Sequence, residues 1–442
     1  MDAGSLEGTL KQSWDEKLIA SPNERVQGYN KFRQTYMGMF QPMFAPTDRE
    51  KQAVAMRKPD TTIIPMTAGM PDANLLPYDE LMEFARATWE RSRPAPLQYG
   101  SSELLKAEIA KYLTRTRGKT VQPNEIYITS GNSNGLVSVM QAYLGPGDIA
   151  IVESPLWTIT ANFMKQTGAE VWSVGLDAEG CSLDELEQKI HAAERDGKRI
   201  KMLYVQPIHH NPTGVTMTRA RAERLLRLAA SKSIIIVSDE PYEMYYYGSQ
   251  PCYLSSMSGG YGVFSVHTFS KTLGTGLRIG FVHSHPEWLA PMQTMPSLNS
   301  SVFWEYTVGE LMASGKYEQI IARAKGVYTE KMKIFCDALQ AHVGRHLAKP
   351  PASNGGFFVW IELASLSAEE VYLQMLELGV ATRVGKNMYG PGHIETSSDG
   401  VAKDCHIGFS FVGPSKEDLA EAARRCGLAC EAVVAKKGSA RL

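Results

Sequence analysis

Short β-branched apolar runs recur through the middle of the chain, and they constrain the fold more than any other feature. Seven of them, between residues 125 and 283, are bounded by Gly, Pro, Asp or Asn and have the length of strands: EIYIT, DIAIVES, AEVWSV, KMLYVQP, SIIIVSDE, GVFSVHTFS and RIGFVH. Helical patterns, such as those at 182–197 and 218–232, lie between several of them. This alternation predicts an α/β fold with a mostly parallel seven-stranded sheet flanked by helices.

After about residue 315 the pattern changes to separated strands and longer helices. A helical stretch at 316–342 is followed by the strand-like GGFFVWIEL and HIGFSFV, with further helical stretches at 368–379 and 416–427. We therefore expect a large domain over 61–315 and a smaller α+β domain over 316–442. Residues 1–60 would form an N-terminal extension that packs with the small domain, including an amphipathic helix within KFRQTYMGMFQPMF (31–44).

Charge and cysteine content exclude several classes of partner. Lys and Arg number 46 against 47 Asp and Glu, so no general attraction to nucleic acid or membrane is expected. No window reaches the roughly 18 apolar residues of a membrane span, and the N-terminus lacks the order of a signal peptide. Six scattered cysteines are typical of reduced thiols in a cytoplasmic protein, and neither the Cys426–Cys430 pair nor HSH (283–285) has the partners of a metal site.

Four loops follow predicted strands at their carboxyl ends, where open α/β sheets bind ligands. ITSGNSNG (128–135) closes a strand and opens a helix, so its backbone N–H groups and Ser133 can hold an anion. NPTG places Asn211 at a strand exit, and DEPY ends an apolar strand on Asp239, a carboxylate that needs a cation or protonated ring nitrogen as partner. TFSK completes the set with Lys271, and Arg278 follows it in the chain.

Together these groups suit a ligand with a phosphate, an aromatic ring containing a basic nitrogen, and a carbonyl that condenses with an amine. Lysine forms Schiff bases with carbonyl compounds, and an acid facing a pyridinium nitrogen is typical of pyridoxal-phosphate sites. Any single loop could be unrelated to ligand binding, but their order on successive strand ends favours the joint interpretation. The sequence therefore predicts that the chain binds pyridoxal 5′-phosphate.

The motifs also resemble those of the class I/II aminotransferase family of fold-type I pyridoxal-phosphate enzymes, over about residues 60–430. They are GMP (69–71), LQYG (97–100), GNSN (131–134), PGDIAIVESPLW (146–157), NPTG (211–214), SDEPY (238–242), TFSKTLGTGLRIG (268–280) and GGFFVW (355–360). The resemblance implies an aspartate-aminotransferase-like fold and a homodimer with shared active sites. It also implies an amino-acid substrate and, for a transaminase, a keto-acid acceptor.

The resemblance assigns catalytic roles to specific positions. Lys271 would carry the cofactor as a Schiff base, exchange it with the substrate amine and then move the α-proton, which requires an amine of lowered pKa. Asp239 would keep the ring nitrogen protonated, and Asn211 and Tyr242 would hydrogen-bond the 3′-oxygen. Trp157 would stack on the ring.

The remaining roles concern the phosphate and the substrate. By the same resemblance, the phosphate would be held by Asn132, Ser133, Thr268 and Arg278, whose planar guanidinium suits an oxyanion. Tyr99 would reach that phosphate from the neighbouring subunit. Gly69, in GMP, and Asn211 would also border the substrate.

One position departs from the family pattern. The family's last strand reads like IRLGFSFV and its arginine binds the substrate α-carboxylate, whereas this chain reads CHIGFSFV (405–412), with His406 in that place. A histidine is mostly neutral at pH 7 and lacks the paired donors of a guanidinium. Three interpretations stay open: another residue, with Arg383 a candidate, holds the carboxylate; the substrate has no free carboxylate there; or the enzyme does not transaminate.

Two alternatives to transamination follow. A changed carboxylate anchor would permit β- or γ-elimination, replacement or decarboxylation on the same cofactor, as in an enzyme of a specialised biosynthetic pathway. A regulatory protein with an aminotransferase-like module would need a fused DNA-binding domain, and the first 60 residues are too short and too balanced in charge for one.

Overall fold

The computed structural model describes residues 46–58, 60–293, 300–397, 400 and 403–439. It divides into two compact units, Met1–Gln52 and Ala53–Leu442, and the helix expected within 31–44 lies outside the described residues. The first described helix is α3 (Asp48–Met56). No described helix has both the length and the apolar character needed to cross a membrane.

The larger sheet belongs to the unit Ala53–Leu442 and contains eight strands. In spatial order they are β2 (Ile126–Thr129), β9 (Gly280–His283), β8 (Val263–Thr268), β7 (Ile235–Asp239), β6 (Ile200–Val205), β3 (Ile149–Ser154), β4 (Glu170–Asp177) and β5 (Gly180–Cys181). The strands from β8 to β4 are parallel, and β9 is antiparallel to both β2 and β8. The predicted mostly parallel α/β sheet is confirmed, although the predicted number of seven strands is too low. The two-residue β5 folds back on β4 after a tight turn, and it is too short to show a hydrophobic pattern.

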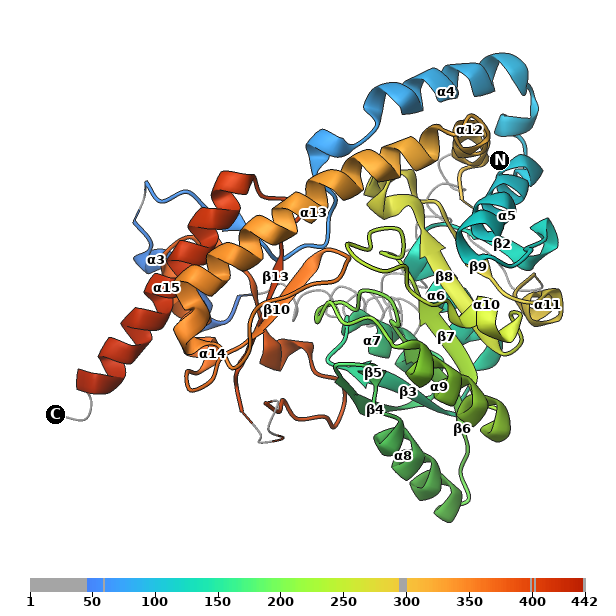
Figure 1. Ribbon diagram of the computed structural model, residues 1–442. Helices are drawn as coiled ribbons and strands as arrows, with labels where there is room; N and C mark the ends of the chain where they lie inside the picture. Colours follow the sequence, from blue (N-terminus) through green and yellow to red (C-terminus); the bar gives the residue numbers. More distant parts are fainter. Residues whose placement is uncertain (1–45, 59, 294–299, 398–399, 401–402, 440–442) are drawn as a thin grey trace, which may run out of the picture. The chain divides into compact units, whose positions relative to one another are not determined.

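Helices cover both faces of this sheet (Figure 1). On one face α8 (Leu183–Arg195) and α9 (Arg219–Lys232) share an apolar cluster with β3, β6 and β7. On the other face α6 (Asn132–Tyr143) lies against β8 so closely that a Cβ on Gly135 would be 2.8 Å from Val266 Cγ1. The other helices in this part of the chain are α4 (Tyr78–Arg91), α5 (Glu103–Arg117), α7 (Ile159–Gln166), α10 (Leu254–Ser258), α11 (Pro286–Gln293) and α12 (Val302–Ala313).

The smaller sheet is antiparallel and lies in the same compact unit. Its order is β10 (Phe358–Glu362), β13 (His406–Ser410) and β12 (Arg383–Val384), while β1 (Ile64–Pro65) pairs in parallel with β11 (Val380–Ala381). The helices of this region are α13 (Lys316–Val343), α14 (Ala368–Glu377) and α15 (Lys416–Ser439), and α13 packs along α15 (Figure 1). The division into a large domain over 61–315 and a small domain over 316–442 stays a prediction.

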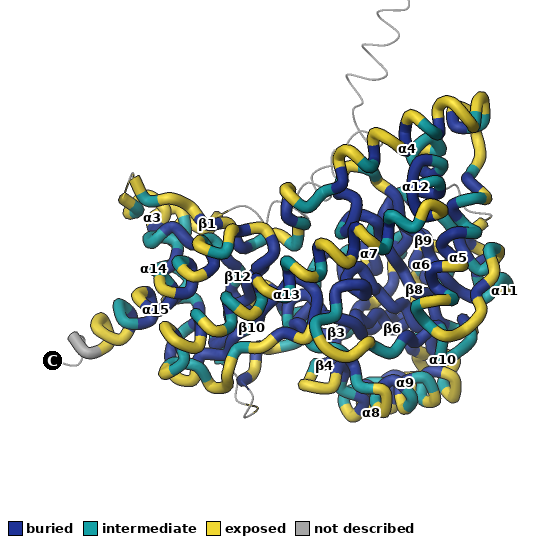
Figure 2. Tube along the Cα trace, turned by 45° about the horizontal axis from the view of Figure 1, so that its top comes forward, coloured by how far each residue is buried: buried dark blue, intermediate teal, exposed yellow. Residues whose placement is uncertain are grey.

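Burial follows the same layers. The strands β3, β7 and β8 are buried along their whole length, as expected for strands with helices on both faces, whereas α4 has one buried and one exposed side (Figure 2). Short 3₁₀ turns connect many elements: η2 (Ala73–Leu75), η3 (Ala95–Leu97), η4 (Pro123–Glu125), η5 (Phe269–Lys271), η6 (Thr275–Leu277), η7 (Gly344–His346) and η8 (Gly385–Met388). All six cysteines are free.

Candidate active site

Lys271 lies in η5, directly after the buried strand β8. Its Nζ donates a hydrogen bond of 2.7 Å to the carbonyl oxygen of Gly69 and is 5.4 Å from the centre of the Tyr242 ring. Burial lowers the pKa of Lys271 to about 8; the carboxylate of Asp239 opposes this shift, and the charges of Arg383 and Arg278 add to it. A substantial fraction of the Lys271 side chain is therefore in the neutral amine form close to pH 7, and this form is a nucleophile and a proton acceptor.

Gly69 allows the backbone to come this close to the lysine. A Cβ at this position would be 2.7 Å from Phe358 Cζ and 2.9 Å from Tyr242 Oη, closer than real Cβ contacts. The Tyr242 and Phe358 rings themselves are 5.6 Å apart in an edge-to-face arrangement. Any larger residue at 69 would thus displace Phe358 and Tyr242, the second of which lies beside Lys271.

Asp239 ends β7 and is 1% exposed. Its Oδ1 accepts a 2.7 Å hydrogen bond from Asn132 Nδ2, and its Oδ2 accepts from Tyr204 Oη at 2.6 Å and Gln206 Nε2 at 3.0 Å. Burial raises the pKa of Asp239, and these three donors, which favour the ionised form, lower it. Sequence reasoning missed Tyr204 and Gln206; the available signal was two polar groups at alternate positions of a strand, which share one face.

Tyr242 and Asn211 stand beside the lysine. Burial raises the pKa of Tyr242 above its usual value, and a hydrogen bond with the Asn211 side chain lowers it. Asn211 Oδ1 is buried and, among the described residues, has no hydrogen-bond partner. An unpartnered buried acceptor costs free energy, so this oxygen marks a place where a donor group of a ligand fits, while Nδ2 is the atom of Asn211 that can donate to a ligand oxygen.

The groups predicted to hold an anion lie where β2 leads into α6. The helix begins after Gly131, which has φ 81° and gives no side-chain cap, so the first N–H groups of α6 stay available. A Cβ on Gly131 would be 2.6 Å from Arg278 Nη2, which places that guanidinium against the loop. Thr268, just before Lys271 in the chain, donates from its Oγ1 to Ser270 Oγ at 2.8 Å. Ser133 is half-buried in the first turn of α6. The side chain of Asn132 points instead to Asp239, so an anion contact from Asn132 would have to come from its backbone N–H.

Arg383 lies on β12 of the smaller sheet, opposite Gly408. Its positive charge lowers the pKa of both Lys271 and Tyr242, which places the guanidinium near these two residues. Burial lowers the pKa of Arg383 itself, and its Nη1 is buried without a hydrogen-bond partner in the described part of the chain. A buried guanidinium with an unused donor is suited to bind a carboxylate.

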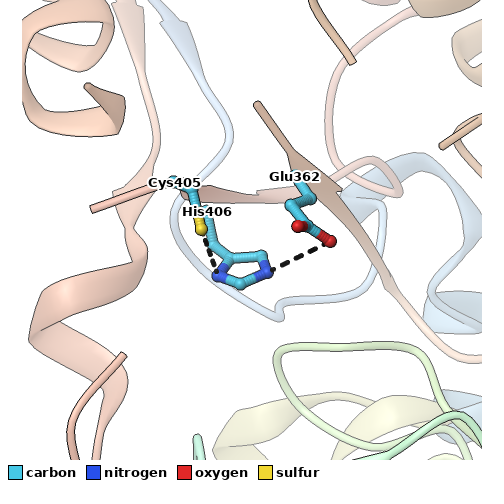
Figure 3. A group of neighbouring side chains, drawn as sticks. All are labelled: Glu362, Cys405 and His406. Atoms are coloured by element: carbon cyan, nitrogen blue, oxygen red, sulfur yellow. Dashed lines mark hydrogen bonds and ion pairs between the residues drawn. The ribbon is translucent and has the colours of Figure 1, made fainter. Parts of the chain in front are cut away.

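His406, the residue at the family's arginine position, faces acidic groups of the small sheet instead. Its Nδ1 is 3.0 Å from Glu395 Oε1 and its Nε2 is 3.9 Å from Glu362 Oε2. The imidazole is stacked on Trp360, with 5.2 Å between ring centres, and lies between the Cys405 sulfur and the Glu362 carboxylate (Figure 3). Nδ1 is therefore engaged by Glu395, whereas Nε2 is beyond hydrogen-bond distance of Glu362, and a substrate-binding role for His406 stays a prediction.

Two other predicted residues have distinct surroundings. The half-buried Trp157 follows β3, and its ring meets Phe163 edge-on with 6.2 Å between centres. Tyr99 is fully exposed at 104% and covers nothing within a single chain. The prediction that Tyr99 reaches a cofactor phosphate therefore requires the site of a second chain.

In the described part of the chain, two groups of three side chains have metal-ligand chemistry. The first consists of Glu362, Cys405 and His406, with the imidazole between the thiol and the carboxylate (Figure 3). In the second, with Glu240, Glu243 and His267, Arg117 Nη2 lies 3.2 and 2.7 Å from the two carboxylates.

The groups around Lys271 match pyridoxal 5′-phosphate in donor type. A lysine of lowered pKa suits the aldehyde, a buried acid suits the ring nitrogen, and an amide–phenol pair suits the ring oxygen. The available helix N–H groups and Arg278 suit the phosphate. An α/β fold with this site defines a pyridoxal-phosphate enzyme of the aminotransferase type.

Comparison with known proteins gives the family. Residues 71–397 match the family model described as aminotransferase class I and II, and the chain belongs to that family. It is a pyridoxal-phosphate-dependent aminotransferase of class I/II.

Several of the curated relatives it resembles are named as aminotransferases, and others are named as HTH-type transcriptional regulators, such as TauR of Rhodobacter capsulatus, 28% identical over 73% of this chain and 64% of that protein. Aromatic-amino-acid aminotransferase 1 of Thermococcus litoralis is 28% identical, over 80% of this chain and 85% of that protein. The 2-aminoadipate transaminase of Thermus thermophilus is also 28% identical, over 84% of this chain and 91% of that protein. A solved single-mutant form of Thermus thermophilus aspartate aminotransferase, 24% identical, shares the fold with a TM-score of 0.71, over 86% of this chain and 95% of that chain. The aspartate-aminotransferase-like fold is thus confirmed.

Proposed function

We propose that this aminotransferase moves the amino group of an α-amino acid to a 2-oxo acid, with the substrate α-carboxylate held by Arg383. The observation that carries the proposal is the buried guanidinium of Arg383, whose Nη1 is unpartnered within the described chain and whose charge acts on both Lys271 and Tyr242. An arginine that pairs with the carboxylate keeps that group in place and favours removal of the α-proton over loss of CO2. The engagement of His406 Nδ1 by Glu395, at 3.0 Å, supports the same assignment.

The cofactor, when bound, supplies an aldehyde that accepts the amino group and an electron-withdrawing ring that acidifies the Cα–H bond. Each of the chain's residues has a separate task. Asp239 holds a proton at the ring nitrogen, Asn211 and Tyr242 donate to the ring oxygen, and Trp157 covers a ring face. The phosphate is held at the start of α6 and beside it, by Asn132, Ser133, Thr268 and Arg278.

Lys271 carries the cofactor and then acts as the base at Cα. Its pKa of about 8 means that a useful fraction of the amine is neutral at physiological pH and can accept the α-proton. The Gly69 carbonyl, 2.7 Å from Nζ, supplies an acceptor that orients the amine whenever it is not joined to the cofactor. Gly69 thereby borders the place where the substrate lies.

We further propose a homodimer with shared active sites. Support comes from exposed apolar and aromatic side chains on α4 and in the segment that follows it: Met82 is 66%, Leu97 65% and Tyr99 104% exposed. Exposed apolar groups of this size are typical of an interaction surface. Tyr99 would reach the phosphate of the neighbouring subunit, and the six free cysteines support a reducing, cytoplasmic compartment.

The test combines a substrate panel with two arginine variants. Purified enzyme is mixed with single amino acids, including aromatic ones and 2-aminoadipate, and conversion of the cofactor to its amine form is followed by absorbance. Arg383→Gln should raise KM for the amino acid by about 10- to 100-fold, because it removes charge-assisted hydrogen bonds of about 1.5–3 kcal/mol each. Cofactor affinity should stay unchanged, and Arg383→Lys should recover part of the loss.

His406→Gln is the matched control, since it changes the other candidate anchor. It should alter KM by less than about threefold, a difference below 1 kcal/mol. The Arg383 assignment is wrong if His406→Gln raises KM and Arg383→Gln does not. Transamination itself is wrong if the enzyme releases CO2 or ammonia from its substrate without any need for a 2-oxo acid.

A further inference from the structure

Gln206 is hydrogen-bonded to both Asp239 and Asn211, the two residues predicted to contact opposite sides of the cofactor ring. Its side-chain Nε2 donates to Asp239 Oδ2 at 3.0 Å, while its Oε1 accepts a 2.9 Å hydrogen bond from the backbone N–H of Asn211. One amide group thus joins the carboxylate expected at the ring nitrogen to the loop expected at the ring oxygen. Among the three donors to Asp239, Gln206 alone also has a described hydrogen bond to Asn211.

The position of Gln206 is itself fixed. The residue is 4% exposed, and its backbone N–H donates to Glu153 Oε2 at 2.6 Å. That same Glu153 oxygen is 3.7 Å from Nε2 of His210, the residue just before Asn211. The end of β6 is therefore held from the β3 side as well as from the β7 side, and Gln206 has little freedom to turn.

The chemistry of the amide explains why both contacts depend on glutamine. An amide offers a donor and an acceptor at once, and here the donor is used on a carboxylate and the acceptor on a backbone N–H. A glutamate would keep the acceptor for Asn211 but would place a second carboxylate against Asp239 unless it were protonated. A leucine would lose both contacts and leave the Asn211 N–H buried without its partner.

We propose that Gln206 is a positioning residue that fixes Asp239 and Asn211 relative to each other. The two residues then act as one rigid unit that contacts the cofactor ring at its nitrogen and at its oxygen. The proposal rests on the ring-facing roles of Asp239 and Asn211 given above. It assigns no chemical step to Gln206, which acts through its two partners.

The experiment compares Gln206→Leu with Tyr204→Phe in the full-length enzyme. Tyr204→Phe is the matched control, because it removes a hydrogen bond to the same Asp239 oxygen and leaves the contact between Gln206 and Asn211 in place. Four quantities are measured: the Kd for pyridoxal phosphate, the pH midpoint of the absorption band of the lysine-bound cofactor, kcat and KM.

Gln206→Leu should weaken cofactor binding about tenfold, lower kcat about tenfold, and shift the pH midpoint of the band, with KM for the amino acid nearly unchanged. Tyr204→Phe should weaken cofactor binding by a smaller factor and leave the pH midpoint in place, because the group at the ring oxygen is not disturbed. Gln206→Glu should resemble Gln206→Leu at neutral pH and approach the original enzyme at low pH, where the added carboxyl group is protonated.

Two outcomes would overturn the proposal. If Gln206→Leu and Tyr204→Phe give the same four values, Gln206 is merely one more partner of Asp239. If Gln206→Leu lowers only the melting temperature, its role is purely structural. Asp239→Asn serves as the reference. If Asp239→Asn weakens cofactor binding and Gln206→Leu does not, the positioning role of Gln206 is wrong but the role of Asp239 stands. If neither variant weakens cofactor binding, both roles are wrong.

Discussion

Lys271 is the residue on which the chemistry depends, and its surroundings change it from an ordinary lysine. Burial removes water from the ammonium form, and the positive charges of Arg383 and Arg278 disfavour that form further. Asp239 opposes both effects, yet the pKa still falls from 10.5 to about 8. The lysine is thus placed where its neutral form can react, while the acid needed at the ring nitrogen stays close by.

This shift predicts how the cofactor attaches. In protein stripped of cofactor, the rate of attachment should rise with pH and level off above a midpoint near 8, because only the neutral amine attacks the aldehyde. Stopped-flow absorbance would measure the rate, and borohydride reduction followed by mass spectrometry would locate the adduct on Lys271. Arg383→Gln should move the midpoint upward by removing a nearby positive charge. A midpoint near 10.5 in the original protein would show that the site does not lower the pKa of Lys271.

At the scale of elements, the ends of the parallel strands β3, β6 and β7 form a buried layer behind the site. Glu153 of β3 is 0% exposed, and burial raises its pKa to about 8. Burial lowers the pKa of the adjacent His210 to about 3. At neutral pH the pair therefore consists of a mostly protonated carboxyl group and a neutral imidazole, which is how two titratable groups can be buried without a net charge.

This layer predicts a stability that falls as pH rises. The carboxyl of Glu153 keeps its proton up to about pH 8 in the folded chain, but an unfolded chain releases it near the usual value of 4.5. The stabilisation from this group is therefore fully present below pH 4.5 and lost as pH rises to 8. Between pH 6.5 and 8 this group should lower the unfolding free energy by about 1.7 kcal/mol, and His210, half protonated at pH 6.5 in the unfolded chain but neutral in the folded chain, should offset about 0.4 kcal/mol of that loss.

Glu153→Gln removes this titration while keeping an acceptor for the Gln206 N–H. From about pH 6.5 to 8 its unfolding free energy should lose the fall seen in the original protein and keep only the small rise contributed by His210, as measured by denaturant titration at several pH values. Glu170→Gln on the neighbouring β4 is the control, because the pKa of Glu170 is lowered by hydrogen bonds to Trp172 and Lys198 and the group stays ionised across this range. Parallel pH curves for Glu153→Gln and the original protein would contradict the raised pKa.

The sequence predicts those parts of the fold and site that depend on local pattern. The alternation of apolar runs gives the parallel sheet, and the loops after the strands bring Asp239, Asn211 and Lys271 to one edge, because the carboxyl ends of parallel strands lie together. Gly69, in a motif far away in the sequence, also lies at this edge, where its carbonyl accepts from Lys271. These placements follow from the order of strands and motifs alone.

What the sequence does not predict depends on pairing between distant segments. The surroundings of His406 come from Glu362 on β10 and from Glu395, and no local pattern places these acids against it. The approach of Arg383 to Lys271 follows from the pairing of β12 with β13. Tyr204 in β6 and Gln206 just after it form an alternating polar pair in the sequence, but only the pairing of β6 with β7 brings that pair to Asp239. The two-residue β5 is too short for any periodic signal.

At the scale of the whole molecule, the proposed dimer predicts that two defective chains can complement each other. Tyr99→Ala should weaken cofactor binding, and Lys271→Ala should abolish activity. In a hybrid of the two chains, the site containing Lys271 receives Tyr99 from its neighbour and is intact, whereas the other site carries both defects. Random mixing of equal amounts makes half of the dimers hybrids with one working site of two, so activity should reach about a quarter of the original enzyme's.

The mixture is assayed at a cofactor concentration below the Kd of the Tyr99→Ala homodimer, where each parent alone is nearly inactive. Co-expression with two different affinity tags isolates the hybrid, whose activity should be about half that of the original dimer because one of its two sites works. Since Tyr99 is fully exposed in a single chain, its substitution should leave the fold of each chain undisturbed, and equal melting temperatures of the stripped proteins check this. A hybrid no more active than its parents would show that each site is built from one chain, and it would leave the exposed aromatic at 99 without a role in binding the cofactor.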